Sequence, residues 1–204
     1  MQAHPLLLPA NGYRRERWHN GAGWTREIVR RDGPAGTWDW RVSIAEIDGP
    51  AAFSRLPGVD REQVLLSGDG LDLEFEGGTV SLEPPHGRHG YPGEAAVRGV
   101  PRGGPVRAFN LMWCRGRVEA ELWHRPLVGS MVLFAGQGST WLLHLLAGQA
   151  RLGNGGTGNG RAGDVLEAGD SVLVPDGAER VRQQLEGHGE ALLVRLSSVA
   201  GGAQ

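Results

Sequence analysis

Apolar and polar residues alternate along several stretches of this chain, and a period of two is the pattern of β-strands with one buried face. Residues 38–47, 64–76 and 164–174 are predicted to be strands. A short connection that contains Gly68 and Gly70 interrupts the second stretch and is typical of a hairpin. Few windows of about twelve residues lack both Gly and Pro, which argues against long helices. The pattern therefore predicts an all-β protein with at most one or two short helices.

A similar arrangement returns about 80 residues later in the sequence, which is the signature of an internal repeat. Residues 65–68 (Leu-Leu-Ser-Gly) align with residues 145–148 (Leu-Leu-Ala-Gly), and residues 81–83 resemble residues 165–167. We interpret this as an internal duplication of one β-barrel. Residues 1–200 are then one two-part unit, with an N-terminal half at about residues 13–125 and a C-terminal half at about residues 126–197.

The composition supports many short strands and tight turns, because the chain has 34 Gly and 12 Pro in 204 residues. All 21 basic residues are Arg, so Schiff-base enzymes and Walker-type nucleotide sites, which need a Lys, are excluded. The net charge is −2 and the sequence has no basic block, so we expect no nucleic-acid partner.

The single cysteine, Cys114, excludes an internal disulfide and a cysteine-rich metal site, and it fits a reducing compartment. The apolar run at residues 6–8 is too short for a signal-peptide core, and no stretch of 18 apolar residues occurs. The sequence therefore predicts a soluble, cytoplasmic protein without a membrane partner.

A segment near the C-terminus, from Gly169 to Arg180, resembles the second sequence motif of cupins. In metal-dependent cupins this motif ends in a His ligand, and Arg180 stands at that position here. The first cupin motif has two His one residue apart on a strand, whereas only His144 lies in the comparable strand. A guanidinium stays protonated and does not bind metal ions. We therefore expect a cupin-like fold with no metal ligands and no cofactor.

The most specific stretch is residues 17–28, Arg-Trp-His-Asn-Gly-Ala-Gly-Trp-Thr-Arg-Glu-Ile. It resembles the signature of the HutD/Ves family of small bacterial bicupins, and blocks at residues 43–70 and 91–112 agree with that family in the same order. Ala22 replaces the middle glycine of the family's turn, so this position need not adopt a positive φ. Ala108 stands where family members often carry Asp. The resemblance implies an all-β bicupin, formed by two cupin-like β-barrels or sandwiches.

Arg26 is the first candidate for a ligand contact, because a guanidinium next to aromatic and aliphatic neighbours suits a carboxylate. On a strand, Arg26 shares one face with Trp24 and Ile28, while Thr25 and Glu27 point to the other face. Arg61, which follows a Pro-Gly turn, is a candidate second cation. The predicted ligand-binding residues are Trp18, Asn20, Gly21, Gly23, Thr25, Arg26, Glu27, Arg61, Asn110 and Met112, and no catalytic residue is assigned.

Each candidate also has a structural interpretation. Gly21 and Gly23 form either an anion-binding nest or an ordinary turn. Arg26 either binds a ligand or pairs with Glu46 or Glu62. Arg61 is alternatively a residue that braces a strand, Trp18 a core residue, and Asn110 an amide that braces the backbone.

Three functions remain open on the sequence. The family resemblance implies a regulatory or accessory protein that binds a small carboxylate, such as a histidine-degradation intermediate in HutD members, whereas Ves members are linked to stress responses. The second possibility is a metal-free cupin enzyme, of isomerase or lyase type, that uses Glu27, His144 or a Tyr as acid or base. The third is a structural or partner-binding β protein that forms a homodimer through an uncovered sheet edge. We expect the first, because no acid–base pair stands at a persuasive spacing.

Overall fold

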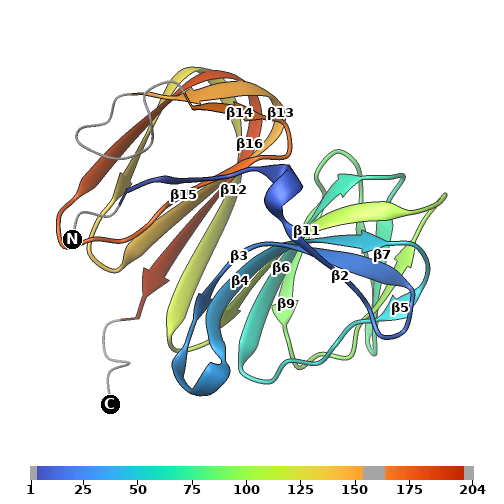
Figure 1. Cartoon of the computed structure of the whole chain (residues 1–204). Helices are drawn as coiled ribbons and strands as arrows, with labels where there is room; N and C mark the ends of the chain where they lie inside the picture. Colours follow the sequence, from blue (N-terminus) through green and yellow to red (C-terminus); the bar gives the residue numbers. More distant parts are fainter. Residues whose placement is uncertain (1–3, 154–163, 200–204) are drawn as a thin grey trace. The chain divides into compact units, whose positions relative to one another are not determined.

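The computed structural model describes residues 4–153 and 164–199, and almost all of its regular structure is β-strand (Figure 1). Within these residues the helical structure consists of two 3₁₀ turns, η1 (Ala10–Gly12) and η2 (Pro34–Gly36). The prediction of an all-β protein is therefore confirmed. The described residues contain no helix with the length and apolar character needed to cross a membrane.

The chain divides into two compact units. One unit is Tyr13–Arg117, and the other combines the residues up to Gly12 with those from Val118 onward. The N-terminal segment belongs to the second unit because β1 (Leu6–Leu8) pairs antiparallel with β15 (Ser171–Val174).

A six-stranded antiparallel sheet forms the larger part of the Tyr13–Arg117 unit, in the order β2-β3-β4-β11-β6-β9. Its strands are β2 (Arg14–Arg17), β3 (Gly23–Asp32), β4 (Trp38–Ile47), β11 (Val106–Cys114), β6 (Val59–Ser67) and β9 (Arg88–Pro92). The predicted strand at residues 38–47 is thus observed as β4.

A four-stranded sheet, in the order β5-β10-β7-β8, completes this unit. Its strands are β5 (Ala51–Ala52), β10 (Arg98–Pro101), β7 (Leu71–Phe75) and β8 (Gly78–Leu82). The predicted strand at residues 64–76 is divided between β6 and β7, and Gly68 and Gly70, both at positive φ, lie between them. Ile47 and Leu65 of the larger sheet and Leu73 of the smaller sheet belong to one apolar core.

The inner face of the larger sheet is apolar at one end and polar at the other. Ala45, Ile47 and Leu65 belong to the core, and residues two or four positions earlier on the same strands, such as Arg41 and Arg61, are polar. Because side chains at i and i+2 share one face of a strand, the polar residues continue the same inner face. The change from apolar to polar residues along this face marks where a site can form.

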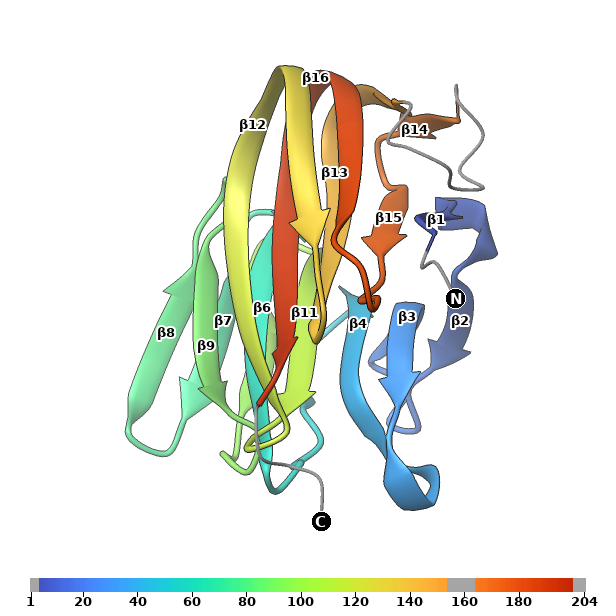
Figure 2. The ribbon, with the colours of Figure 1, turned by 90° about the vertical axis from the view of Figure 1, so that its left-hand side faces the viewer.

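The second unit contains one sheet, in the order β1-β15-β13-β16-β12, with β14 paired to β13 (Figure 2). β12 (Val118–Ala135) and β16 (Val181–Ser198) pair antiparallel along their whole length, and β13 (Ser139–Leu152) pairs with β16 on its other side. The predicted strand at residues 164–174 is observed as β14 (Val165–Glu167) and β15. Leu residues from these strands form an apolar core.

The sheets do not close into barrels. In the described residues each sheet has at least two edge strands, for example β2 and β9 in the larger sheet of the Tyr13–Arg117 unit. Closure requires every strand to pair on both sides. The expectation of closed barrels is therefore corrected to open sheets, whereas facing sheets around one core are present in the Tyr13–Arg117 unit.

Strand order and register nevertheless correspond between the two units. The order β4-β11-β6-β9 in one unit matches β12-β16-β13-β15 in the other. The cross-strand row Ser43–Asn110–Gln63 has its counterpart in the row Trp123–Leu193–Leu143. Both units also skip one residue of the ladder at equivalent places, Leu66 in β6 and Leu146 in β13.

Candidate functional site

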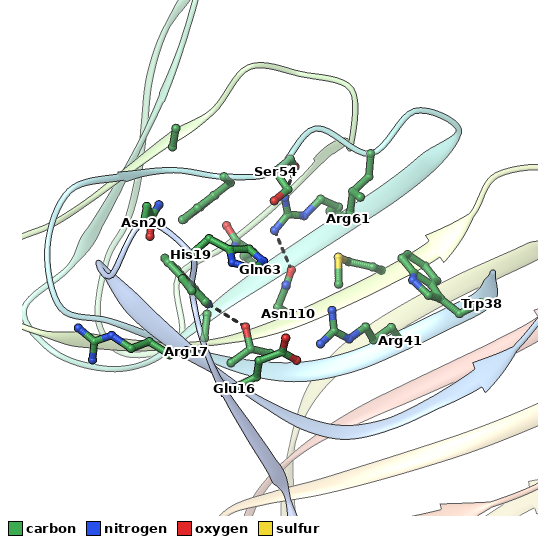
Figure 3. Close-up of a pocket in the computed structure, with 17 residues that line it drawn as sticks. Glu16, Arg17, His19, Asn20, Trp38, Arg41, Ser54, Arg61, Gln63 and Asn110 are labelled. Carbon is green, nitrogen blue, oxygen red and sulfur yellow. Dashed lines mark hydrogen bonds between the residues drawn. The ribbon is translucent and has the colours of Figure 1, made fainter. Parts of the chain in front are cut away.

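A pocket with a volume of about 420 Å³ opens on the polar end of the inner face in the Tyr13–Arg117 unit (Figure 3). A cavity of several hundred Å³ is the usual size of a site for a small organic molecule. Its polar and charged lining residues are Glu16, Arg17, His19, Asn20, Thr25, Arg41, Ser54, Arg61, Gln63 and Asn110. Its apolar and aromatic lining residues are Trp18, Trp38, Ala45, Ala52, Phe53, Leu56 and Met112.

Three neighbouring strands place the deepest polar residues in rows across the sheet. Arg41 of β4, Met112 of β11 and Arg61 of β6 are direct cross-strand neighbours. The next row toward the core places Asn110 of β11 beside Gln63 of β6. The antiparallel register therefore gathers polar side chains that are far apart in the sequence.

Arg61 is the most deeply buried charged residue of this pocket, and the residue is 6% exposed. Nη1 donates to the backbone oxygen of Ser54 and Nη2 donates to Oδ1 of Asn110, each over a long distance of 3.4 Å. Nε is buried and has no hydrogen-bond partner. No carboxylate in the described part of the chain forms an ion pair with this guanidinium. The cation is thus only weakly compensated by the protein.

Aromatic rings hold the Arg61 guanidinium in place. Its Cζ lies 5.3 Å from the ring centroid of Tyr91 and 5.6 Å from that of Phe53, which are cation–π distances. Burial lowers the pKa of Arg61, Tyr91 acts in the opposite direction, and the charge of Arg41 lowers the pKa further. The guanidinium still remains charged at neutral pH, because an arginine is not deprotonated in proteins.

The amides beside Arg61 are oriented by the same strands. Oδ1 of Asn110 accepts the hydrogen bond from Arg61, and Oε1 of Gln63 accepts a hydrogen bond from the Tyr91 hydroxyl at 3.1 Å. Burial raises the pKa of Tyr91 although Arg61 opposes this effect, so the hydroxyl stays protonated and able to donate. Asn110 combines both interpretations that the sequence left open, since it supports Arg61 and lines the pocket.

Arg41 lies at the other side of the same row and is half-buried. Its Nε donates to Oε2 of Glu27 at 2.7 Å, and this pair joins β4 to β3. Glu27 does not itself line the pocket, and it takes part in the site through Arg41. Glu27 could therefore act as an acid or base, the role that the sequence left open, only by breaking its ion pair with Arg41.

The signature loop at residues 18–23 forms one wall of the pocket. Asn20 accepts a hydrogen bond from the backbone N–H of Ala22 at 3.1 Å, and the N–H of Gly21 donates to the oxygen of Trp18 at 2.9 Å. These two N–H groups are thus used within the loop, so the turn interpretation is observed rather than an anion-binding nest. Gly21 has a φ of 71°, whereas Ala22 does not have a positive φ, as expected.

Gly23 is required by close packing rather than by its φ. A Cβ at this position would lie 2.3 Å from the backbone oxygen of Glu46, on the neighbouring strand β4. Trp18, whose Nε1 donates to Oγ1 of Thr25 at 2.8 Å, would also be contacted. The signature sequence therefore allows β3 and β4 to approach while Trp18 and Thr25 face the pocket.

Arg26 does not line the pocket. Its Nε donates to Oε1 of Glu46 at 2.6 Å, and Arg15 donates to Oε2 of the same carboxylate. Burial raises the pKa of Glu46, but the hydrogen bonds and charges of Arg15 and Arg26 outweigh burial and hold this pKa below its ordinary value. The alternative in which Arg26 is a structural residue paired with Glu46 is the geometry observed.

Most of the residues predicted from the sequence come together in the structure. Those that line the pocket are Trp18, Asn20, Thr25, Arg61, Asn110 and Met112, while Gly21, Gly23, Arg26 and Glu27 lie outside its lining. The period-two pattern separated the two faces of β3 correctly. Thr25 and Glu27 lie on the side of the pocket and Arg26 on the other, so of the two candidate cations only Arg61 lines this pocket.

Arg41, Gln63 and Phe53 are lining residues that sequence reasoning missed. Gln63 stands two positions after Arg61 on β6, and Arg41 alternates with apolar residues on β4. The sequence signal that could have identified Arg41 and Gln63 was a charged or amide residue among the apolar residues of one strand face.

The cupin-motif residues belong to the other unit. His144 is buried, and its ring nitrogen Nδ1 lies 2.9 Å from Oγ of Ser171, so it is a hydrogen-bonded core residue. Arg180 lies over the ring of Phe134, at 4.4 Å from its centroid. At the places equivalent to Ser43 and Arg61, this unit has Trp123 and Trp141, whose rings stack at 5.9 Å.

Comparison with protein families gives one match that spans most of the chain. The family is described as HutD, and its model matches residues 10–193.

Two individual proteins are similar to part of the chain. The chain is 37% identical over 117 residues to an uncharacterised 21.2 kDa protein in the hutC 3′ region of Pseudomonas putida, and the match covers 57% of this chain and 62% of that protein. It is 34% identical over 106 residues to protein Ves of Citrobacter koseri, covering 52% and 56%. The matches thus span less than two thirds of either relative.

Two solved structures resemble nearly the whole chain. HutD from Pseudomonas fluorescens SBW25 is 26% identical, with a TM-score of 0.81 over 96% of this chain and 100% of that one. PA5104 from Pseudomonas aeruginosa PAO1 is 26% identical, with a TM-score of 0.80 over 97% and 100%. YlbA from Escherichia coli, at 10% identity and a TM-score of 0.70, shares the fold over 100% of this chain and 94% of its own.

Proposed function

The chain belongs to the HutD family, and we propose that it binds a small carboxylate in the pocket of the Tyr13–Arg117 unit, with Arg61 as the main partner of the anion. The observation that carries this proposal is the state of Arg61. Arg61, a residue that is 6% exposed, has long hydrogen bonds and an unpartnered Nε, and it lines a cavity of about 420 Å³.

Burying a charge without an opposite charge is expensive, because the protein interior replaces the hydration that is lost only where it supplies partners. A carboxylate offers two oxygens in the plane of the guanidinium and forms charge-assisted hydrogen bonds with two of its N–H groups. The hydrogen bonds of Nη1 and Nη2 within the protein are long, at 3.4 Å, so these two groups are the ones suited to that contact. Ligand binding would therefore supply the counter-ion that the free protein lacks.

The walls indicate that the ligand is larger than its carboxylate. Trp18, Phe53 and Met112 contribute apolar surface to the same cavity that Arg61 enters. Apolar walls with a few polar groups are typical of sites for small metabolites. A carboxylic acid with a flat or short apolar body fits this distribution.

The biological role that we propose is regulatory or accessory, through binding of a histidine-degradation intermediate such as urocanate or N-formylglutamate. A similar protein of Pseudomonas putida is named for its place in the hutC 3′ region, which supports a link to histidine utilisation. The role rests on this link and on the cation, and binding by itself requires no catalytic group.

The equivalence of strand order between the units supports a further part of the proposal, namely a cupin-like unit that was duplicated. In this view the Tyr13–Arg117 unit keeps an open pocket, and the stacked Trp123 and Trp141 occupy the equivalent positions in the other unit. The polar row Ser43–Asn110–Gln63 and the apolar-aromatic row Trp123–Leu193–Leu143 would then have evolved from the same row of the ancestral unit.

Calorimetric titration of the full chain with acetate, urocanate, N-formylglutamate and glutamate tests the proposed function. Replacing Arg61 with Gln should cost about 2–5 kcal/mol of binding if the contact is buried and bidentate. At 1.4 kcal/mol per decade this is roughly 30-fold to several thousand-fold in affinity. Arg26→Gln is the matched control, because Arg26 lies outside the pocket lining. Equal affinity of Arg61→Gln and the parent protein for every carboxylate would refute the proposal.

A further inference from the structure

The pocket has a second arginine whose hydrogen-bonding capacity is only partly used. Arg41 donates from Nε to Glu27, and its terminal Nη groups make no hydrogen bond with any residue that the structure describes. The guanidinium has five N–H donors in a planar fork, so its Nη edge remains able to hold a second acceptor. Arg41 lines the pocket, and its side chain is 25% exposed.

Two other arginines of this chain show that one guanidinium can bind two carboxylates at once. Arg115 donates from Nε to Asp60 and from Nη1 to Glu94, so one guanidinium serves two carboxylates. Arg102 likewise forms ion pairs with Asp72 and Glu83. Arg41 pairs with one carboxylate, and its Nη edge has the capacity that Arg115 uses for a second one.

The register fixes the spacing between the two pocket arginines. Arg41 and Arg61 are both neighbours of Met112, on the strands that flank β11. Adjacent strands lie about 4.8 Å apart, so the two Cα atoms are separated by roughly 10 Å. Figure 3 shows both guanidiniums at the same cavity, with Asn110 of the intervening strand between them.

We infer that the pocket takes a short dicarboxylate, with one carboxylate bound by Arg61 and the other by the Nη edge of Arg41. The inference rests on the proposed carboxylate site and extends it by one contact. The charge of Arg41 repels that of Arg61, and two anionic groups on one ligand would relieve this repulsion at both places. A monocarboxylate would satisfy Arg61 alone and leave Arg41 with only Glu27.

The experiment compares dicarboxylates with monocarboxylates of equal chain length. Succinate, glutarate and adipate are titrated into the full chain by calorimetry at low salt, next to butyrate, pentanoate and hexanoate. We expect at least one dicarboxylate to bind tenfold or more tightly than its monocarboxylate partner. The preference should fall as ionic strength rises, because part of the pocket is open to solvent.

A double variant of Arg41 and Glu27 tests whether Arg41 binds the second carboxylate of the ligand. Arg41→Gln together with Glu27→Gln removes both charges, so that no unpaired carboxylate remains in the fold. In this variant the dicarboxylate should bind no more tightly than the monocarboxylate, whose own affinity should change less than twofold. Arg41→Lys, which keeps the charge but not the planar fork, should retain only part of the preference and serves if the double variant does not fold.

Arg17 is the matched control cation, because it also lines the pocket but donates to the backbone oxygen of Gly21 and lies over Trp24. Arg17→Gln should keep the preference for dicarboxylates. Equal affinity for both ligand series at every chain length, or a preference lost in Arg17→Gln but kept in the double variant, would overturn the inference. Dependence of monocarboxylate binding on Arg61 would still hold in either case, so this failure is distinct from failure of the proposed function.

Discussion

Nε of Arg26 lies 2.6 Å from Oε1 of Glu46, and this contact decides the role of Arg26 within the signature sequence. Arg15 binds the other oxygen of the same carboxylate, so Glu46 joins β2, β3 and β4. The guanidinium of Arg26 is committed to the sheet and lies outside the pocket lining. Arg26 is therefore a structural residue in this sheet.

Replacing Arg26 with Ala is expected to leave carboxylate affinity within about twofold of the parent protein, as no direct contact is lost. The variant should lose about 1 kcal/mol of unfolding free energy, because the pair with Glu46 is partly exposed. Titration with acetate and urea denaturation measure the two effects. A loss of affinity of tenfold or more with the fold intact would show that Arg26 reaches the ligand.

Glu46 predicts a pH dependence of stability. Its pKa is lower in the folded protein than in the unfolded chain, so its contribution is present above the unfolded pKa of about 4.5 and is lost as pH falls through the folded pKa. Glu46→Gln should therefore reduce stability by about 1–2 kcal/mol at pH 7 and by less below pH 4. Urea denaturation between pH 3 and pH 7 measures the difference. A deficit that is constant over this range would contradict the assignment.

We expect Arg61 to lower the unfolding free energy of the ligand-free protein, because its charge is buried without a counter-ion among the described residues. Replacing it with Met keeps similar volume and removes a buried charge without a counter-ion, so we expect a gain of about 1–2 kcal/mol. For a chain of this size that is a rise in melting temperature of roughly 2–8 °C. Thermal denaturation without ligand tests the gain. An unchanged or lower melting temperature, with native circular dichroism, would mean that the charge is adequately compensated.

A substitution at Asn110 can supply Arg61 with a carboxylate from the protein itself. Oδ1 of Asn110 lies 3.4 Å from Nη2 of Arg61, so Asn110→Asp would place a carboxylate beside the cation. The new ion pair should stabilise the free protein and weaken carboxylate binding by at least tenfold, since the ligand would meet a neutralised and negatively lined site. Asn110→Ser, which introduces no charge, is the control. Unimpaired binding in the Asp variant would indicate that the anion does not use Arg61.

Gly23 should be intolerant of any side chain. The added Cβ of Gly23→Ala would lie 2.3 Å from the backbone oxygen of Glu46, and relief requires β3 and β4 to separate. We expect a loss of about 1–3 kcal/mol. Gly49→Ala, where an added Cβ meets no atom within 4 Å, is the control and should change stability much less. Comparable denaturation midpoints for the two variants would refute the steric argument.

The alternating pattern was enough to predict the strands, because burial of one strand face imposes a period of two on the sequence itself. Residues 38–47 were located to the residue as β4, and the break at Gly68 and Gly70 was placed between β6 and β7. Trp18, Thr25 and Arg61 were among the predicted ligand-binding residues, and all three line the pocket. Signals of this kind are local, so a single sequence contains them.

The register between strands is not a local property, and the rest of the site depends on it. A period of two gives Thr25 and Arg26 opposite faces but does not say which face meets the cavity, because that depends on how the other sheet covers the strand. Arg41 and Arg61 become neighbours of Met112 only through the pairing of β4, β11 and β6. Closure of the sheets likewise depends on the pairing of edge strands, for which the sequence had no separate signal.

The sequence by itself determined the all-β class, the positions of the main strands and the chemistry available to this protein, which is rich in arginine and has no lysine. These properties follow from residue types and their spacing. Tertiary structure alone decided which arginine is neutralised and which is not. Arg26 meets Glu46 across neighbouring strands, while Arg61 is buried beside Asn110 with no carboxylate partner among the described residues, because long-range pairing and not spacing along the chain sets each cation's surroundings.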